Sequence, residues 1–331
     1  MTTGTPFRRA AVSAAVLLAL GWWSHVGAQR APLSVLTPEP MRYESPDEAP
    51  VNSWWLPTGD GGLIVFDALR TITDALGEVS ALQKSGRPVR AILLTHPHPD
   101  HVTGLATLKN AFPKAPVYST AEAVSYLQGK GKTLLAMNVE ARGQADATKR
   151  IPQPDILLHD GQRLMISGVE IEVKSLGTGE SPAATVYFVP SMNTLVVGDV
   201  MTPGRVPLLA AGHTAAWLKQ IENLRRSYRP STRILPGHGP ATLLQRAAGW
   251  QEQYIEAFRR EVERATRKDT EGGPCVTAEE GRRILADVRR QYPTHERVAR
   301  MPAEALDALN LEGVGWELTG HACPGAPNPI R

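Results

Sequence analysis

This chain of 331 residues has few cysteines and a small net charge. Its two cysteines, Cys275 and Cys323, stand late in the sequence, and neither belongs to a Cys-x-x-Cys pair. This scarcity argues against a metal site built from thiolates, which need several cysteines at short spacing. The formal net charge is only +3 at pH 7, with 36 basic and 33 acidic residues. Without a basic stripe, such a balance argues against a nucleic-acid-binding protein.

Long hydrophobic runs are also absent, apart from a short one near the N-terminus. Arg8 and Arg9 precede an apolar run from Ala10 to Trp23, and the small residues Val26-Gly27-Ala28 follow it. This order is typical of a secretory signal peptide, here residues 1–28, and the run is too short for a comfortable membrane span. We expect a periplasmic or secreted protein with no stable membrane insertion after cleavage. An uncleaved N-terminal anchor is the alternative.

Export changes the expectation for the two cysteines. Pairs of cysteines in exported proteins are usually joined, because the compartment is oxidising. We therefore predict a disulfide between Cys275 and Cys323 that staples the C-terminal tail, and two free thiols would contradict it.

The composition indicates a globular α/β protein. Hydrophobic residues make up 42% of the chain and charged residues 21%, which suffices for one large core with a helical appendage. Strand and helix patterns alternate through two halves of residues 29–245, which favours layers with helices outside. A long amphipathic pattern over 241–268 and two further helical patterns, over 277–291 and 302–310, make residues 246–331 a C-terminal helical extension. No internal repeat is visible, and no feature indicates an oligomeric state.

A histidine-rich loop follows the apolar run Val89–Leu94, which has the pattern of a buried strand. His96 and His98 alternate with prolines, and Asp100 and His101 follow at once. Imidazole and carboxylate are donors that Zn²⁺ and similar divalent ions prefer, and the prolines stiffen the loop that presents them. The loop is therefore a candidate metal site.

Three later donors stand beside glycines at strand ends. Glu180 follows Gly179 ahead of a strand, Asp199 follows Gly198 after a strand, and His238 lies between two glycines. A glycine lets the backbone bend sharply or approach a site closely. Each signal is weak by itself, but in this order behind the histidine loop they predict one metal site.

These motifs resemble the metallo-β-lactamase superfamily. His96-x-His98-x-Asp100-His101 is similar to its metal-binding loop, Gly198-Asp199 to its aspartate, and Pro236-Gly237-His238-Gly239 to its last histidine. The strand sequence Asn52-Ser53-Trp54-Trp55 and the strand-ending Asp67 fit as well. The resemblance covers roughly residues 45–245, and it implies a four-layer αβ/βα sandwich with a two-metal site at one edge.

The chain departs from this family at one ligand. The segment Gly179-Glu180-Ser181-Pro182 places glutamate where the family usually has histidine, and both Pro182 and the next strand set this register. A similar segment occurs in the alkylsulfatase branch, so Glu180 is a credible ligand. That branch carries glutamate where this chain has Asp199, so the similarity is partial.

The resemblance implies the following ligand sets: one ion held by His96, His98 and Glu180, and a second by Asp100, His101 and His238, with Asp199 bridging. Zinc is the expected metal, with two ions per chain, and iron or manganese is possible. Three carboxylates and a hydroxide would neutralise two divalent ions, and such a cluster tolerates harder ions.

The resemblance implies an exported metallo-hydrolase in which a metal-bound hydroxide, oriented by Asp100, cleaves an ester, lactone, amide or sulfate ester of a small-molecule substrate. Two alternatives remain: an iron-dependent thiol or persulfide dioxygenase on the same scaffold, and a non-catalytic metal-binding relative.

Five other residues receive structural expectations. Asp67 is expected to cap the following helix, with support of the metal site as the alternative. His213 is expected at a helix end on the surface, with a place at the mouth of the site as the alternative. Arg205 is expected in a solvated loop, with contact to an anionic substrate as the alternative. Trp54 and Trp55 alternate across a strand, so we expect one in the core and the other above the cleft.

Overall fold

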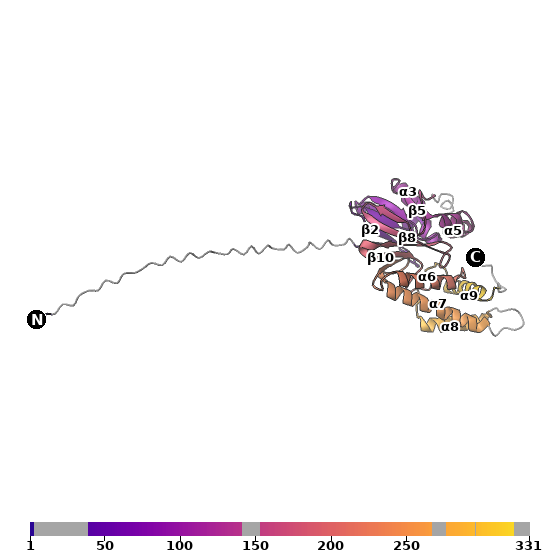
Figure 1. Ribbon diagram of the computed structural model, residues 1–331. Helices are drawn as coiled ribbons and strands as arrows, with labels where there is room; N and C mark the ends of the chain where they lie inside the picture. Colours follow the sequence, from indigo (N-terminus) through magenta and orange to yellow (C-terminus); the bar gives the residue numbers. More distant parts are fainter. Residues whose placement is uncertain (3–38, 141–152, 267–275, 295, 321–331) are drawn as a thin grey trace. The chain divides into compact units, whose positions relative to one another are not determined.

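Two mixed six-stranded β-sheets form the centre of the fold (Figure 1). The computed structural model describes residues 1–2, 39–140, 153–266, 276–294 and 296–320. Apart from residues 1–2, the predicted signal peptide lies outside these ranges, and so do both cysteines of the predicted disulfide. Residues Thr37–Arg331 make one compact unit. Within the described ranges, none of the helices combines the length and the hydropathy that crossing a membrane requires.

The first sheet has the order β1-β2-β3-β4-β5-β6. Strands β1 to β3 are antiparallel and β3 to β6 are parallel. The bounds of the six strands are β1 Met41–Glu44, β2 Asn52–Pro57, β3 Leu63–Phe66, β4 Val89–Leu93, β5 Val117–Thr120 and β6 Ile156–Leu158. All four residues of β3 are buried, because a strand of an inner sheet is covered on both faces.

The second sheet has the order β12-β11-β10-β9-β8-β7 and is antiparallel except for the parallel pair β10 and β11. The bounds are β7 Arg163–Ile166, β8 Val169–Gly177, β9 Ala184–Val189, β10 Thr194–Gly198, β11 Arg233–Pro236 and β12 Thr242–Leu243. In β8, buried residues alternate with partly exposed ones along most of the strand, as expected for a strand with one face on the core.

Helices cover the outer face of each sheet (Figure 1). On the first sheet and at its edge lie α1 Ile72–Lys84, α2 Pro99–Val102, α3 Leu105–Ala111, α4 Ala121–Gln128 and α5 Lys130–Glu140. On the second lie α6 Thr214–Ser227, α7 Leu244–Thr266, α8 Ala278–Gln291 and α9 Ala303–Thr319, and a 3₁₀ turn Pro190–Met192 precedes β10. The predicted αβ/βα sandwich with a helical C-terminal region is confirmed.

Three hydrophobic clusters hold the layers together. One lies between the two sheets, one between the first sheet and its helices, and one between the second sheet and α6 to α9. Trp54 belongs to the first cluster and donates from Nε1 to the carbonyl of Pro236, 2.8 Å away. Trp55 belongs to the second and donates to Glu78. Both tryptophans are therefore core residues, and the expectation that one roofs the cleft was wrong.

The C-terminal helices are continuous with the core of the second sheet. Phe258 of α7, Ile284 of α8 and Val314 of α9 pack in the same cluster as Trp217 of α6. Helix α9 extends well past residue 310, where the helical pattern in the sequence ends. Gly313 explains why that pattern is weak: a Cβ there would lie 2.5 Å from the carbonyl oxygen of Ala210. Close packing therefore demands glycine although glycine disfavours helix.

Candidate metal centre

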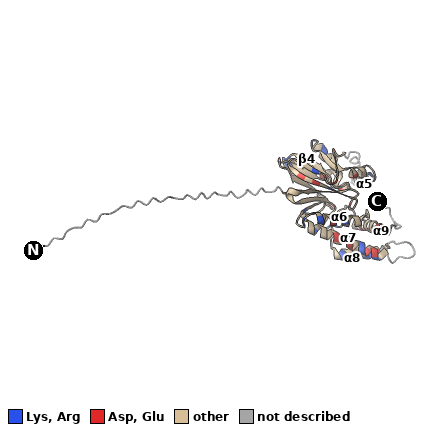
Figure 2. Cartoon of the chain, viewed as in Figure 1, with Lys and Arg blue, Asp and Glu red and all other residues tan. Residues whose placement is uncertain are grey.

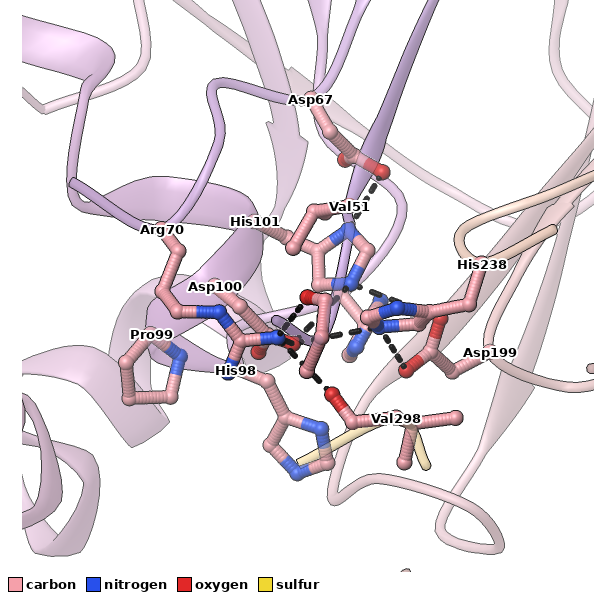
Figure 3. A network of polar contacts seen from close by, with 12 residues as sticks. Val51, Asp67, Arg70, His98, Pro99, Asp100, His101, Asp199, His238 and Val298 are labelled. Carbon is pink, nitrogen blue, oxygen red and sulfur yellow. Dashed lines mark hydrogen bonds and ion pairs between the residues drawn. The ribbon is translucent and has the colours of Figure 1, made fainter. Parts of the chain in front are cut away.

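All seven predicted donor residues meet at one edge of the sandwich. Five of them are labelled in Figure 3: His98, Asp100, His101, Asp199 and His238. The histidine loop follows β4, Glu180 lies just ahead of β9, and Asp199 and His238 follow β10 and β11. Strand β9 is antiparallel to β10, so its start lies beside the end of β10. The topology therefore brings four chain segments to the same edge.

The first donor group consists of His96, His98 and Glu180, all buried. His98 Nδ1 lies 3.2 Å from Glu180 Oε1, and His96 Nε2 lies 3.9 Å from Glu180 Oε2. Glu180 thus stands in the third position of the group, as its register in the sequence predicts.

The second donor group consists of Asp100, His101, Asp199 and His238. His238 Nε2 lies 3.3 Å from both Asp100 Oδ2 and Asp199 Oδ2. His101 Nε2 lies 3.4 Å from Asp199 Oδ1 and 3.8 Å from Asp100 Oδ2. The two groups correspond to the two predicted ligand sets.

Asp67 fixes the orientation of His101. Its Oδ2 accepts from His101 Nδ1 and from the hydroxyl of Thr95, each at 2.8 Å, and its Oδ1 accepts from the backbone N–H of Thr95 at 2.8 Å. The expectation that Asp67 caps the next helix was wrong, because Thr71 caps α1 by accepting from the N–H of Asp74. A carboxylate behind a ligating imidazole orients the ring and raises its basicity.

The other Nδ1 contacts also leave Nε2 free. His238 Nδ1 donates to the carbonyl of Pro50, 2.6 Å away. The hydroxyl of Thr95 gives its single proton to Asp67, so it must accept from His96 Nδ1, 2.9 Å away. With Nδ1 protonated, a neutral imidazole presents a lone pair at Nε2. His96, His101 and His238 therefore all direct Nε2 lone pairs into the site.

The donor atoms fit divalent cations. Lone pairs of imidazole nitrogens face carboxylate oxygens at 3.3–3.9 Å, a spacing close to the ~3.3 Å that separates ligands on a tetrahedral zinc shell. Buried polar atoms are rarely left unpaired in folded proteins. Six buried donor atoms here have no hydrogen-bond partner: His96 Nε2, His98 Nε2, His101 Nε2, His238 Nε2, Glu180 Oε2 and Asp199 Oδ1.

Burial and neighbouring charges set the protonation of these groups. Burial would raise the pKa values of Asp100 and Asp199, but Arg70 beside Asp100 and the imidazoles beside both hold them well below the usual range. Burial raises the pKa of Glu180 and lowers the pKa of His96 well below its ordinary value. The two aspartates therefore stay ionised and His96 stays neutral. Although burial opposes it, the neighbouring carboxylates raise the pKa values of His98, His101 and His238, so a proton and a divalent cation compete for the lone pairs of these imidazoles.

Two glycines make room for the donors. A Cβ on Gly237 would lie 2.1 Å from Asp199 Oδ1 and 2.7 Å from His101 Cε1. Gly198 has a φ of +52°, and a Cβ there would lie 2.6 Å from the hydroxyl of Thr95. Glycine is therefore required in the Gly-Asp and Gly-His motifs, because neighbouring donor-site atoms lie too close to the backbone for a Cβ at either position.

Two arginines near the site differ from what the sequence suggested. Arg205 is buried and pairs with Glu296, so the expectation of a solvated loop residue was wrong. Arg70, which the sequence reasoning missed, lies 3.3 Å from Asp100 Oδ2. The sequence feature that could have indicated Arg70 is its position three residues after the strand-ending Asp67. His213, as expected, is exposed at the start of α6.

A two-sheet sandwich with two buried groups of histidine and carboxylate donors at one edge defines a metallo-hydrolase-like site. The chain belongs to the metallo-beta-lactamase superfamily, whose family model matches residues 46–238. With this membership and these donors, it is a metallo-hydrolase of that superfamily.

Individual relatives are distant. The chain is 26% identical over 163 residues to the "Probable metallo-hydrolase YybB" of Bacillus subtilis (strain 168), covering 49% of this chain and 67% of the relative. It is 31% identical over 153 residues to a hydroxyacylglutathione hydrolase of a Synechococcus strain, covering 44% of this chain and 50% of the relative. The crystal structure of a β-lactamase domain protein from Burkholderia ambifaria matches 84% of this chain and 85% of its own, with a TM-score of 0.60 at 20% identity. This last likeness concerns the fold alone.

Proposed function

We propose that this protein is an exported hydrolase that holds two zinc ions and cleaves an ester, lactone, amide or sulfate ester of a small molecule. The convergence of His238 Nε2 with oxygens of Asp100 and Asp199 carries the proposal. Although burial opposes it, the two carboxylates raise the pKa of His238, so the position between them attracts a proton or a divalent cation. His96, His98 and Glu180 provide a second group for another cation. Cations bound there would lower the pKa of a bound water and polarise the substrate's reacting oxygen.

Asp100 is the residue that we assign to the reacting water. Its side chain is 14% exposed, whereas the side chains of His238 and Asp199 are 0% and 5% exposed. A carboxylate at the accessible rim of the site accepts a hydrogen bond from the water that attacks the substrate and so orients it. Its low pKa keeps it ionised for this role.

We infer the substrate class from the charge of the chain and from one relative, and not from the shape of a pocket. The near-zero net charge of the mature chain, with 34 basic and 33 acidic residues after residue 28, supports a small-molecule substrate rather than a nucleic acid. Basic and acidic residues are interspersed along α7 and α8 (Figure 2). A thioester belongs among the test compounds because one relative is named as a hydroxyacylglutathione hydrolase.

The proposal is tested by metal content and activity measured together. We expect about two zinc ions per chain and hydrolysis of at least one chromogenic ester, thioester, lactone, β-lactam or sulfate ester. Asp100→Ala should lower the rate by roughly 10²–10⁴-fold, whereas Asp160→Ala, at an exposed carboxylate outside the two donor groups, should not. One iron per chain with oxygen consumption on a thiol would instead support a dioxygenase, and no bound metal would refute the proposal.

Export is proposed on residues 1–28 alone. Basic, apolar and small residues follow each other there as in a signal peptide. The mass of the mature protein recovered from the periplasm or medium tests it, with cleavage after Ala28 as the expected result. A full-length chain retained in the membrane would support the uncleaved anchor.

A further inference from the structure

The segment Glu296–Arg300, between α8 and α9, is tied to the loop that follows Asp199. The N–H of Val206 donates to the carbonyl of Glu296 at 2.8 Å, and the N–H of Val298 donates back to Val206 at 3.3 Å. Arg205 also pairs with the side chain of Glu296. The C-terminal region therefore contacts the chain beside the donor groups, about 100 residues away in sequence.

Arg70 connects this segment to a donor residue (Figure 3). Its Nη2 donates to the carbonyl of Val298 at 2.8 Å and to the carbonyl of Ala49 at 3.0 Å, and it lies 3.3 Å from Asp100 Oδ2. Arg70 is only 5% exposed. One nitrogen thus lies among two carbonyls and one carboxylate oxygen.

Asp47 provides the counter-charge for this guanidinium and joins a second residue of the segment. Its Oδ2 lies 3.7 Å from Arg70 Nε, and its Oδ1 lies 3.3 Å from Arg300 Nε. The Asp47 side chain is 5% exposed and Arg300 is 43% exposed. A continuous chain of charges therefore leads from the surface through Asp47 and Arg70 to Asp100.

The planar guanidinium of Arg70 has an orientation that its acceptors fix. A guanidinium is planar and always charged, so a buried one adopts the orientation that its acceptors dictate. Removal of one partner from a buried charged network leaves an uncompensated group and costs far more than loss of a surface ion pair. Val298 and Asp47 therefore fix the guanidinium of Arg70, with its Nη2 3.3 Å from Asp100 Oδ2.

We propose that Arg70 is a positioning residue through which Glu296–Arg300 holds Asp100 in place for the second cation, so that the C-terminal helical region completes the metal site. The inference rests on the proposed two-cation centre. His101 and His238 are held by Asp67 and by the carbonyl of Pro50, and Asp100 belongs to the second donor group only, so the coupling concerns one ion of the two.

Zinc titration of the full chain against a chromophoric chelator tests the proposal. In Arg70→Met we expect one of two Zn²⁺ ions to bind about 10–100-fold more weakly, with the other unchanged. Arg70→Lys, which keeps the charge without the fork of donors, should fall between. Asp100→Asn should weaken the same ion. Arg259→Met is the matched control, because Arg259 pairs with Glu317 between α7 and α9 at 2.9 Å without touching a donor.

Hydrogen exchange provides a readout in the unaltered protein. Coupling between two sites is reciprocal, so Zn²⁺ should slow exchange of the Val298 amide several-fold in the wild type and in Arg259→Met. That protection should be lost in Arg70→Met and reduced in Arg70→Lys. Two results would overturn the inference while leaving the proposed function intact. One is that the folded Arg70 variants bind both Zn²⁺ ions as tightly as the wild type does. The other is that Zn²⁺ does not change the exchange rate of the Val298 amide in the wild type. A wild-type chain that binds no Zn²⁺ would refute both.

Discussion

Single atoms decide whether the imidazoles of this site present a lone pair or a proton. His101 and His238 donate from Nδ1 to Asp67 and to the carbonyl of Pro50. His96 donates to the hydroxyl of Thr95, whose own proton is already committed to Asp67. Asp67 therefore controls two imidazoles, one directly and one through a hydroxyl.

Replacement of Asp67 by asparagine should weaken metal binding. In one orientation the new amide nitrogen would face the backbone N–H of Thr95. In the other it would face the N–H of His101, and the ring would then favour the tautomer with a protonated Nε2. We expect Asp67→Asn to bind Zn²⁺ about 10–100-fold more weakly, measured by chelator competition, with an unchanged circular dichroism spectrum. Asp160→Asn, an exposed carboxylate that accepts from Ser175, is the control. Equal Zn²⁺ affinity in Asp67→Asn would show that Asp67 does not act on the ligands.

Glu180 should determine which metal the site prefers. Its carboxylate adds a negative charge to the first donor group, and hard oxygen donors suit Mn²⁺ and Fe²⁺ better than imidazole does. We expect Glu180→His to shift the bound metal toward zinc when the protein is loaded from an equimolar mixture of Zn²⁺ and Mn²⁺, with the fold retained. Mass spectrometry of the eluted metals measures the ratio. Identical metal content in the two proteins would count against Glu180 as a ligand.

At the scale of elements, α1 carries an ionisable group into the core. Glu78 is fully buried on the face of α1 that packs on β2, where its Oε1 accepts from Trp55 Nε1 at 2.9 Å. Its Oε2 has no hydrogen-bond partner. Burial raises the pKa of Glu78 from 4.5 to about 7, partly offset by the hydrogen bond from Trp55.

This raised pKa makes the attachment of α1 sensitive to pH. The folded chain binds more protons than the unfolded chain between pH 4.5 and about 7, so the contribution of Glu78 falls as the pH rises through this window. The difference corresponds to about 3 kcal/mol above pH 7. Urea unfolding of Glu78→Gln should therefore show a gain over the wild type at pH 8 that is larger than at pH 5. A constant difference at both pH values would contradict the assignment.

For the whole molecule, the donor groups join the two sheets. The histidine loop belongs to the first sheet, whereas Asp199 and His238 follow strands of the second. Cations bound there would cross-link the sandwich and relieve repulsion among buried carboxylates.

Metal removal should lower the stability of the whole fold. A ligand that binds only the folded state adds about 2.7 kcal/mol at a free concentration of 100 Kd. We expect calorimetry to show a higher Tm in excess Zn²⁺ than in chelator. The gain should be smaller in Asp100→Ala, which loses a donor of the second group. A Tm that is the same with Zn²⁺ and with chelator would show that the site does not bind zinc in the folded protein.

Much of the fold and most of the donors could be predicted from sequence, because their signals are local. Apolar runs that end in glycine and polar residues mark the strand ends, and the histidine loop follows one of them. Pro182 and the next strand set the register that makes Glu180 a donor. These inferences needed no knowledge of distant contacts.

Only the tertiary structure shows which residues contact the donor residues and fix their orientation. Asp67 is 34 residues from His101, and Val298 is 228 residues from Arg70, so no local pattern relates either pair. A strand-ending aspartate has the same sequence appearance whether it caps a helix or holds an imidazole. Which role it takes depends on which distant residues the fold places beside it. Hydrogen bonds and ion pairs act over a few ångströms of space, whatever the separation of the two residues along the sequence.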